Sequence, residues 1–338
     1  MKLGIVGGPG AGKTTLFEAL TKTDPGAGHK NENRIAAIHV PDKRVDVLHD
    51  MYQPKKTVYA QIEYFLPGHA GDKDRETQWN AVKDCDALIH VVQNFPVPGM
   101  TAPDPGKELA DLDDEFILSD LIVVEKRMER IEADKKRGKK GDPAEVDLLE
   151  KARHLLEAGV PLRNDSEVAG APLLRGFAFV SAKPVLVLIN NAEDDVDLPA
   201  GIPDGVECMV ARGKLEHEIS TMSAEDAREF LDEFDIDEPA TDRAIRRSYE
   251  ILGLISFFTV GSDEVKAWTI RKGTPAVEAA GVIHSDIQKG FIRAEVVAYD
   301  DLMDAGTYAE ARKRGTTRLE GKTYEMKDGD IVNFRFNV

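Results

Sequence analysis

The first twenty residues contain the pattern that most constrains the fold, a glycine-rich loop between a short apolar run and a helix-forming stretch. Lys2–Val6 is typical of a buried strand, GGPGAGKT covers residues 7–14, and helix-forming residues continue to Thr21. The loop matches GxxxxGK[ST] at every fixed position, in the strand-loop-helix context that this motif requires. Its glycines let backbone amides curl around phosphate oxygens, and the positive end of the helix adds to the attraction. The sequence therefore predicts a phosphate-binding loop.

The contacts expected within this loop follow from its chemistry. Lys13 is expected to reach the β and γ phosphates of a nucleoside triphosphate, and the Thr14 hydroxyl is expected to ligate Mg²⁺. The alternative is a glycine-rich turn that holds no ligand. The residues predicted to bind the phosphates are Gly8, Pro9, Gly10, Ala11, Gly12, Lys13, Thr14 and Thr15.

Further apolar runs, separated by helical patterns, predict a parallel sheet covered by helices on both faces. These runs lie at residues 60–65, 87–92, 185–189 and 207–210. A two-helix hairpin is predicted to interrupt the alternation, because apolar residues recur there at steps of four and three amid dense charge. Its seam is expected to contain Ile117, Leu121, Val124, Met128 and Ile131, and on the return helix Leu148, Leu149, Ala152, Leu155 and Leu156.

The carboxy-terminal part predicts a small mixed β-sheet module with one helix. Strand-like runs alternate apolar and polar residues, and the turn Asp328-Gly329 precedes the last strand. The expected domains are a nucleotide-binding domain at 1–106 and 165–253, a helical hairpin at 107–164 and this module at 254–338. Most of its aromatic residues are expected in the core, although neighbouring basic residues leave base stacking on RNA open.

Composition excludes several functional classes. The 338 residues carry a net charge of −17, which argues against DNA binding through a general positive field. No apolar run approaches the about 20 residues that span a bilayer, and no leader pattern is present. A cytoplasmic protein without membrane contact is expected. Cys85 and Cys208 lie too far apart in the sequence to indicate a disulfide framework or a zinc site.

Taken together, these motifs resemble the YchF-type ATPases and GTPases, an Obg-related group of P-loop proteins. The similar stretches are the phosphate loop, CDALIHVVQNF, LEKARHLLEAG, and FFTVGSDEVKAWTI with the ending KDGDIVNF. The resemblance implies a P-loop α/β domain, an inserted helical coiled coil, and a C-terminal TGS domain of ubiquitin-like β-grasp fold. It also implies Mg²⁺ as cofactor and partners associated with the ribosome or RNA.

The stretch INNAED stands where relatives in this superclass carry the guanine-reading NKxD motif. The residues expected at the base are Asn190, Asn191 and Glu193. Glutamate is one methylene too long for the bidentate contact that aspartate makes with guanine, and Asn191 lacks the lysine stem that covers a base. The resemblance therefore implies ATP as the preferred nucleotide and GTP as a second ligand. The alternative is a polar loop at the end of a strand.

Both switch segments depart from the family. GHKNENRIAAIHVPD offers no switch I threonine, and Leu66 and Pro67 stand where the family begins DxxG. That aspartate normally holds the metal through water, so hydrolysis is expected to be slow or impaired. Asp72 and Asp74 are candidates for replacing it from shifted positions.

His69 lies in the same segment and is the candidate catalytic residue. The resemblance implies this role, because a histidine from a flexible loop has been proposed in YchF-like proteins where Ras-like enzymes use glutamine. The alternative is an exposed loop histidine.

Three functions remain open at this point. The first is a slow ATPase that couples its nucleotide state to the ribosome, the second is a non-hydrolysing regulator, and the third is an RNA or ribosome adaptor led by the TGS domain. The hairpin tip is the candidate RNA contact, or else a solvated turn. It contains Lys135, Lys136, Arg137, Lys139 and Lys140.

Overall fold

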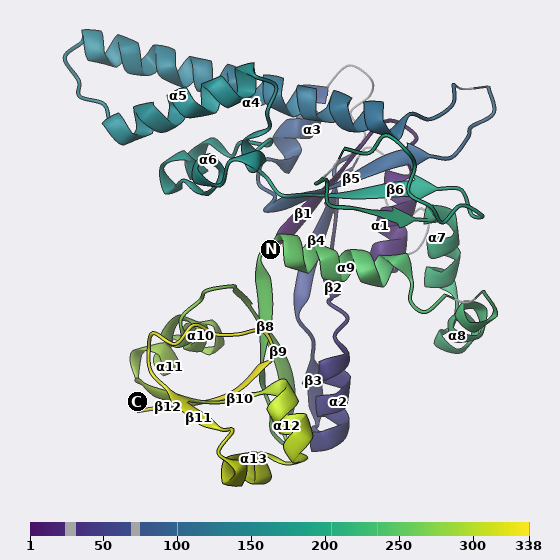
Figure 1. The fold of residues 1–338 in the computed structure, drawn as a ribbon, viewed down its shortest axis with the longest axis vertical. Coiled ribbons are helices and arrows are strands. Elements are labelled where there is room, and N and C mark those ends of the chain that lie inside the picture. Colours follow the sequence, from purple (N-terminus) through teal and green to yellow (C-terminus); the bar gives the residue numbers. More distant parts are fainter. Residues whose placement is uncertain (24–31, 69–74, 100, 204, 235, 338) are drawn as a thin grey trace. The chain divides into compact units, whose positions relative to one another are not determined.

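The computed structural model describes residues 1–23, 32–68, 75–99, 101–203, 205–234 and 236–337. Contacts group the chain into two units, one of residues 1–37 and 63–244, the other of residues 38–62 and 245–338. Each unit contains its own sheet (Figure 1). The grouping of residues 38–62 with the C-terminal part was not expected from the sequence, and the predicted domain boundaries stay predictions.

The sheet of the first unit has the strand order β2-β4-β1-β5-β6-β7. Parallel pairings join β4 to β1, β1 to β5, β5 to β6 and β6 to β7, which confirms the predicted parallel sheet. Their carboxyl ends share one edge, where ligands bind in folds of this kind. The strands are β1 (Lys2–Val6), β2 (Arg34–His39), β4 (Gln61–Leu66), β5 (Ala87–Asn94), β6 (Val185–Asn191) and β7 (Cys208–Ala211).

Helices lie against this sheet (Figure 1). Separate clusters of buried apolar side chains join them to its strands. The helix that follows the phosphate loop packs beside α7. Elsewhere on the sheet, Trp79 of α3 and Phe116 of α4 are buried against Val6 and Leu88. The helices of this unit are α1 (Lys13–Thr21), α3 (Arg75–Val82), α4 (Pro105–Lys136), α5 (Pro143–Glu157), α6 (Ser166–Gly170), α7 (Gly213–Thr221) and α8 (Ala224–Glu233), with 3-10 turns η1 (Leu162–Asn164) and η2 (Pro172–Phe177). Helix α9 (Ala240–Ile251) includes the boundary between the two units.

Helices α4 and α5 form the predicted hairpin, which extends from the sheet of the first unit (Figure 1). Each helix begins with a proline directly after an aspartate that accepts a backbone N–H, Asp104 for α4 and Asp142 for α5. The seam residues expected from the sequence all belong to one cluster of buried and partly buried side chains. Arg127 and Glu145 join the helices through two hydrogen bonds of 2.8 Å.

The second unit contains a mixed sheet with the strand order β11-β10-β12-β8-β9-β3. Pairings of β8 with β9 and of β10 with β11 and β12 are antiparallel, whereas β12 with β8 and β3 with β9 are parallel. The strands are β3 (Lys56–Val58), β8 (Leu254–Thr259), β9 (Glu264–Arg271), β10 (Phe291–Ala298), β11 (Arg318–Glu320) and β12 (Asp330–Phe336); the helices are α2 (Lys43–Tyr52), α10 (Ala276–Ile283), α11 (Ser285–Lys289), α12 (Tyr299–Ala305) and α13 (Tyr308–Arg314).

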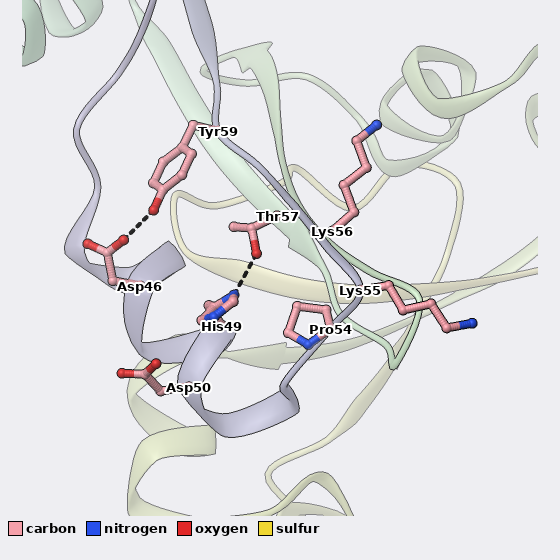
Figure 2. Close-up of a pocket in the computed structure, with 8 residues that line it drawn as sticks. All are labelled: Asp46, His49, Asp50, Pro54, Lys55, Lys56, Thr57 and Tyr59. Carbon is pink, nitrogen blue, oxygen red and sulfur yellow. Dashed lines mark hydrogen bonds between the residues drawn. The ribbon is translucent and has the colours of Figure 1, made fainter.

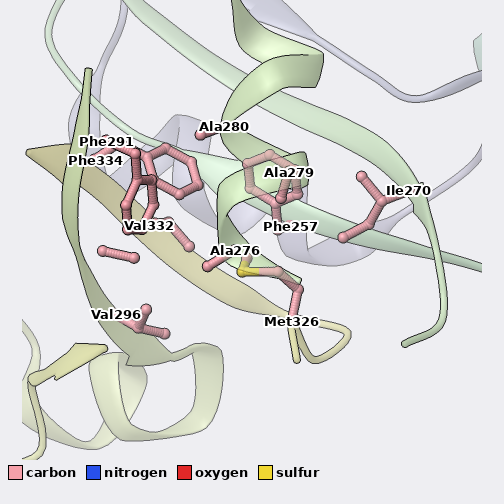
Figure 3. Packing of buried hydrophobic residues seen from close by; sticks show 11 residues of the cluster. Phe257, Ile270, Ala276, Ala279, Ala280, Phe291, Val296, Met326, Val332 and Phe334 are labelled. Atoms are coloured by element: carbon pink, nitrogen blue, oxygen red, sulfur yellow. The ribbon is translucent and has the colours of Figure 1, made fainter. Parts of the chain in front are cut away.

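Aromatic side chains fill the core of this unit, as expected (Figure 3). Phe257 and Phe258 are fully buried, Phe291 is 5% exposed, and Trp268 is partly buried against the cluster. Small residues of α10, among them Ala276 and Ala279, let this helix pack closely on the sheet. Phe257, Phe258 and Phe291 are therefore core residues, as expected, and base stacking stays a prediction.

Residues 38–62, which are distant in the sequence from the rest of this unit, add strand β3 to its sheet and helix α2 beside it. Strand β3 pairs with β9 in parallel, with Lys56 opposite Glu264. Helix α2 is capped by Asp42, whose carboxylate also binds the Arg44 guanidinium, and Arg44 reaches on to Asp328 at 2.8 Å.

None of the helices within the described ranges is both long enough and apolar enough to cross a bilayer.

Candidate functional site

The phosphate loop lies between β1 and α1 and depends on glycine at fixed points. Gly7 has φ 145°, and a Cβ there would lie 2.2 Å from the Val91 carbonyl oxygen. Gly12 ends the loop at φ 94°, immediately before α1. Only glycine adopts these conformations without strain. The chain therefore folds closely against β5 and leaves Pro9 and Gly10 exposed.

Lys13 folds back over this loop. Its Nζ donates to the carbonyl oxygens of Gly7 at 2.9 Å and Gly8 at 2.7 Å. Burial lowers the pKa of Lys13, and the carboxylate of Glu108 offsets part of that effect. A partly desolvated ammonium held by neutral carbonyls gains from an anionic partner, so the geometry suits a phosphate group.

Thr14 is exposed in the first turn of α1, and Thr15 is half-buried beside it. An exposed hydroxyl at this point fits one ligand position of Mg²⁺, which retains several waters and takes further oxygens from phosphates. Within the described ranges, no three side chains of His, Cys, Asp or Glu gather as a metal site. The donor set therefore fits a metal held mainly by nucleotide and water.

Asn190, at the end of β6, joins the phosphate loop to the start of α7. Its side-chain Nδ2 donates to the Ala11 carbonyl at 2.9 Å, and its Oδ1 accepts the Gly213 backbone N–H at 2.8 Å. A Cβ on Gly12 would lie 2.2 Å from Asn190 Nδ2. The structure thus brings Asn190 to the phosphate loop, as a brace between the loop and the start of α7.

The other two base-motif residues lie apart from the loop. The Asn191 side chain is 4% exposed and turned into its own segment, where it accepts from Asn94 and donates to the carbonyls of Asp195 and Asp197. Glu193 is exposed and lies 2.5 Å from Lys214 at the start of α7. Their contact with a base stays a prediction.

The end of β4 lacks a carboxylate at the position where the family pattern has one. Leu66 is 6% exposed, and the Gly68 backbone N–H donates to the Asn33 side chain at 2.9 Å. This bond joins the segment directly before β2 to the segment after β4. The candidate catalytic residue His69, together with Asp72 and Asp74, lies outside the described residues.

Glu108 belongs to this site, although the sequence-based interpretation did not include it. Its Oε1 accepts the Gly8 backbone N–H at 3.2 Å, and its Oε2 accepts the Gln93 backbone N–H at 3.1 Å. Burial raises the pKa of Glu108, against the lowering effect of these amides and of Lys13. Its position offered a signal, because an acidic residue in the first turn of a helix after a central strand lies near the ligand edge of the sheet.

A separate pocket of about 400 Å³ lies within the second unit (Figure 2). His49 Nδ1 and Thr57 Oγ1 are 2.7 Å apart, and the Tyr59 hydroxyl donates to Asp46. Lys55 and Lys56 at its rim form ion pairs with Asp263 and Glu264. Each of these polar side chains already has a partner within its pair. These pairs therefore give no reason to expect a ligand in the pocket.

Comparisons with known proteins converge on one family. The family model YchF-GTPase_C, described as "Protein of unknown function (DUF933)", matches residues 254–337. The chain is 36% identical to the "Ribosome-binding ATPase YchF" of Bacillus subtilis, with 99% of each chain covered. It is 34% identical to the "Obg-like ATPase 1" of Oryza sativa subsp. japonica, covering 100% of this chain and 92% of the relative.

A solved structure agrees with these sequences. The "Structure of the Schizosaccharomyces pombe YchF GTPase" superposes with a TM-score of 0.83 at 30% identity. The match covers 99% of this chain and 97% of the other. It therefore extends over both units, including the fold expected for a P-loop domain followed by a C-terminal domain.

Proposed function

Because the chain belongs to the YchF family, we propose that it binds ATP with Mg²⁺ at the phosphate loop and couples its nucleotide state to the ribosome. The observation that carries this proposal is the loop itself, closed against β5 by Gly7 and held by Lys13. The relatives support the same function, because both are named ATPases and the Bacillus subtilis protein is named a ribosome-binding ATPase.

The proposed binding mode assigns the chain's own groups to the triphosphate. Backbone amides of residues 10–15 and the start of α1 face the phosphate oxygens. The Lys13 ammonium moves from the Gly7 and Gly8 carbonyls to the β and γ phosphates, and the Thr14 hydroxyl binds Mg²⁺. When bound, Mg²⁺ would neutralise negative charge on the phosphates.

ATP is the preferred nucleotide in this proposal because the base site lacks the groups that select guanine. The Asn191 side chain is committed to Asn94, Asp195 and Asp197, so it offers no cover for a base. Glu193 already pairs with Lys214. Guanine recognition depends on a well-placed carboxylate that accepts two hydrogen bonds, and nothing in this arrangement holds Glu193 for that contact.

Hydrolysis is proposed to be slow. Leu66 replaces the carboxylate that would order a metal-bound water, and loss of such an outer partner typically lowers metal affinity or activity by about 10 to 100-fold. His69 remains the candidate for positioning the attacking water. A protein that binds ATP without any turnover is the second candidate, and the same buried Leu66 favours it.

Titration of the full chain with ATP and with GTP in the presence of Mg²⁺ tests the proposal. We expect ATP to bind at least about tenfold more tightly than GTP, which corresponds to about 1.4 kcal/mol. A single-turnover assay on the same samples should show slow phosphate release. Tighter binding of GTP would contradict the assigned base preference, and absent release with intact ATP binding would favour the non-hydrolysing regulator.

The hairpin tip is the proposed contact with ribosomal RNA. Its basic residues are all exposed, and exposed cations near an RNA backbone gain affinity by releasing counterions. The net charge of −17 makes the tip a local exception in an acidic protein. An adaptor led by the C-terminal domain, proposed to be a TGS domain, is the competing arrangement, although its aromatic residues are largely enclosed in the core. The tip residues are Lys135, Lys136, Arg137, Lys139 and Lys140.

Neutralising these five tip residues as glutamines should weaken co-sedimentation with ribosomes. The slope of log affinity against log salt concentration should become less negative by about 0.7 to 0.9 for each phosphate contact that is lost. Neutralising Lys126 and Arg130, which are exposed on α4 away from the tip, provides the matched control. If both variants sediment as wild type does, the tip is a solvated turn.

A further inference from the structure

Glu108 connects the phosphate loop to the longest helix of the described structure. One carboxylate bridges two backbone amides, Gly8 in the loop and Gln93 at the end of β5. The fit is close, because a Cβ on Gly8 would lie 2.9 Å from Glu108 Oε1. Any displacement of Glu108 therefore breaks contacts to the loop, to β5, or to both.

The helix that carries Glu108 is fixed at its start. The Asp104 side chain accepts the Lys107 backbone N–H at 3.0 Å, and the Glu108 backbone N–H donates to the Asp104 carbonyl at 3.0 Å. From this first turn, α4 continues for 32 residues to Lys136 at the hairpin tip. The phosphate loop and the hairpin are thus joined by one continuous helix.

Charge at this junction changes when a nucleotide binds. Burial lowers the pKa of Lys13 and raises the pKa of Glu108, and the opposite charge of each group offsets part of this effect on the other. In the proposed binding mode, ATP draws Lys13 toward its phosphates and introduces several negative charges near the carboxylate. Like charges in a partly buried site repel strongly because little solvent screens them.

We propose that Glu108 is a positioning residue of the phosphate loop, and that through it ATP binding rearranges the first turns of α4 at the base of the hairpin. This inference rests on the proposed ATP binding. Two properties of the carboxylate have separate roles: its oxygens hold the Gly8 and Gln93 amides, and its charge responds to the phosphates. Glutamine keeps one acceptor oxygen, turns its NH2 group toward the other amide and removes the charge, so it retains part of the first role and none of the second, whereas alanine removes both.

The test measures ATP affinity and hydrogen–deuterium exchange of residues 105–118 in the full chain, with and without saturating Mg²⁺ and ATP. In wild type, ATP should change exchange in this segment by about threefold or more, since the first turns of α4 open locally. Glu108→Ala should weaken ATP binding by about 10-fold, as loss of a supporting partner does. Glu108→Gln keeps one of the two amide contacts, so it should weaken ATP binding less than Glu108→Ala does, yet at saturating ATP it should lose the ATP-dependent change in exchange.

Asp114→Asn serves as the matched control, because Asp114 is an exposed carboxylate on the same helix. It should behave as wild type in both measurements. Wild type that binds ATP without any change in residues 105–118 would overturn the inference and leave the proposed function intact. The same ATP-dependent change in Glu108→Gln as in wild type would also overturn it. Absence of ATP binding in wild type would instead refute the proposed function.

Discussion

Replacing Asp120 with alanine is expected to lower the free energy of unfolding by about 3–5 kcal/mol, because it leaves buried hydrogen-bond donors without a partner. Asp120 is 0% exposed on α4. Its carboxylate accepts the Val180 N–H at 3.1 Å, the Ser181 N–H at 2.8 Å and the Ser181 hydroxyl at 2.6 Å. These bonds attach the hairpin helix to the segment that precedes β6.

Urea unfolding of the full chain measures this effect, with the slope compared between variants to verify that the same surface unfolds. Asp120→Asn should fall between wild type and alanine, since it retains one acceptor but places an amide group among donors. Asp114→Asn, exposed on the same helix, should change stability by less than about 0.5 kcal/mol. A loss below about 1 kcal/mol in Asp120→Ala would show that the buried bonds matter little to the fold.

Replacing Lys13 with alanine is expected to weaken ATP binding by about 100-fold. Hydrogen bonds from a charged donor contribute about 1.5–3 kcal/mol each, and Lys13 is expected to contact two phosphates. The substitution also removes the bonds from Nζ to the Gly7 and Gly8 carbonyls, so the empty loop becomes less ordered. Both effects act against binding.

Calorimetric titration with Mg²⁺ and ATP checks this prediction. Lys126→Ala, at an exposed lysine on α4, controls for the loss of one positive charge and should bind as wild type does. Lys13→Arg should not restore affinity, because the planar guanidinium does not reproduce the compact ammonium on its flexible stem. Equal ATP affinity in wild type and Lys13→Ala would place the nucleotide elsewhere.

The parts of the fold that sequence predicted correctly depend on local patterns. Strand β1, the loop and α1 follow from one motif with its flanking residues, and the hairpin follows from the spacing of apolar residues such as Val124 and Leu149, which meet in its seam. Such patterns extend over a few helical turns, so residues that are close together in the sequence determine these elements.

The parts that sequence missed depend on distant pairing. Lys56–Val58 has no strong strand pattern and becomes a strand because β9 offers an open edge about two hundred residues later in the sequence. Asp120 occupies a buried position that its type would not predict, because its partners lie on another segment. Glu108 was missed for the same reason, since its partners Gly8 and Gln93 lie elsewhere in the chain.

Within the site, the sequence predicted Asn190 as a base-binding residue, which stays a prediction, and did not predict its contacts with the phosphate loop. Its Nδ2 donates to the Ala11 carbonyl, and its Oδ1 accepts the Gly213 backbone N–H. Asn191 is enclosed by its own segment, which no motif predicts. The motif lies at the end of β6, which meets the phosphate loop through Asn190, and packing decides which of its side chains remain available to a ligand.

A crystal structure of the full chain with Mg²⁺ and a non-hydrolysable ATP analogue tests the central claim most directly. The account predicts a triphosphate on the amides of residues 10–15, with Lys13 Nζ moved from the Gly7 and Gly8 carbonyls to phosphate oxygens and the Thr14 hydroxyl on Mg²⁺. Lys13 still bonded to those carbonyls, with the nucleotide bound elsewhere or absent, would contradict it.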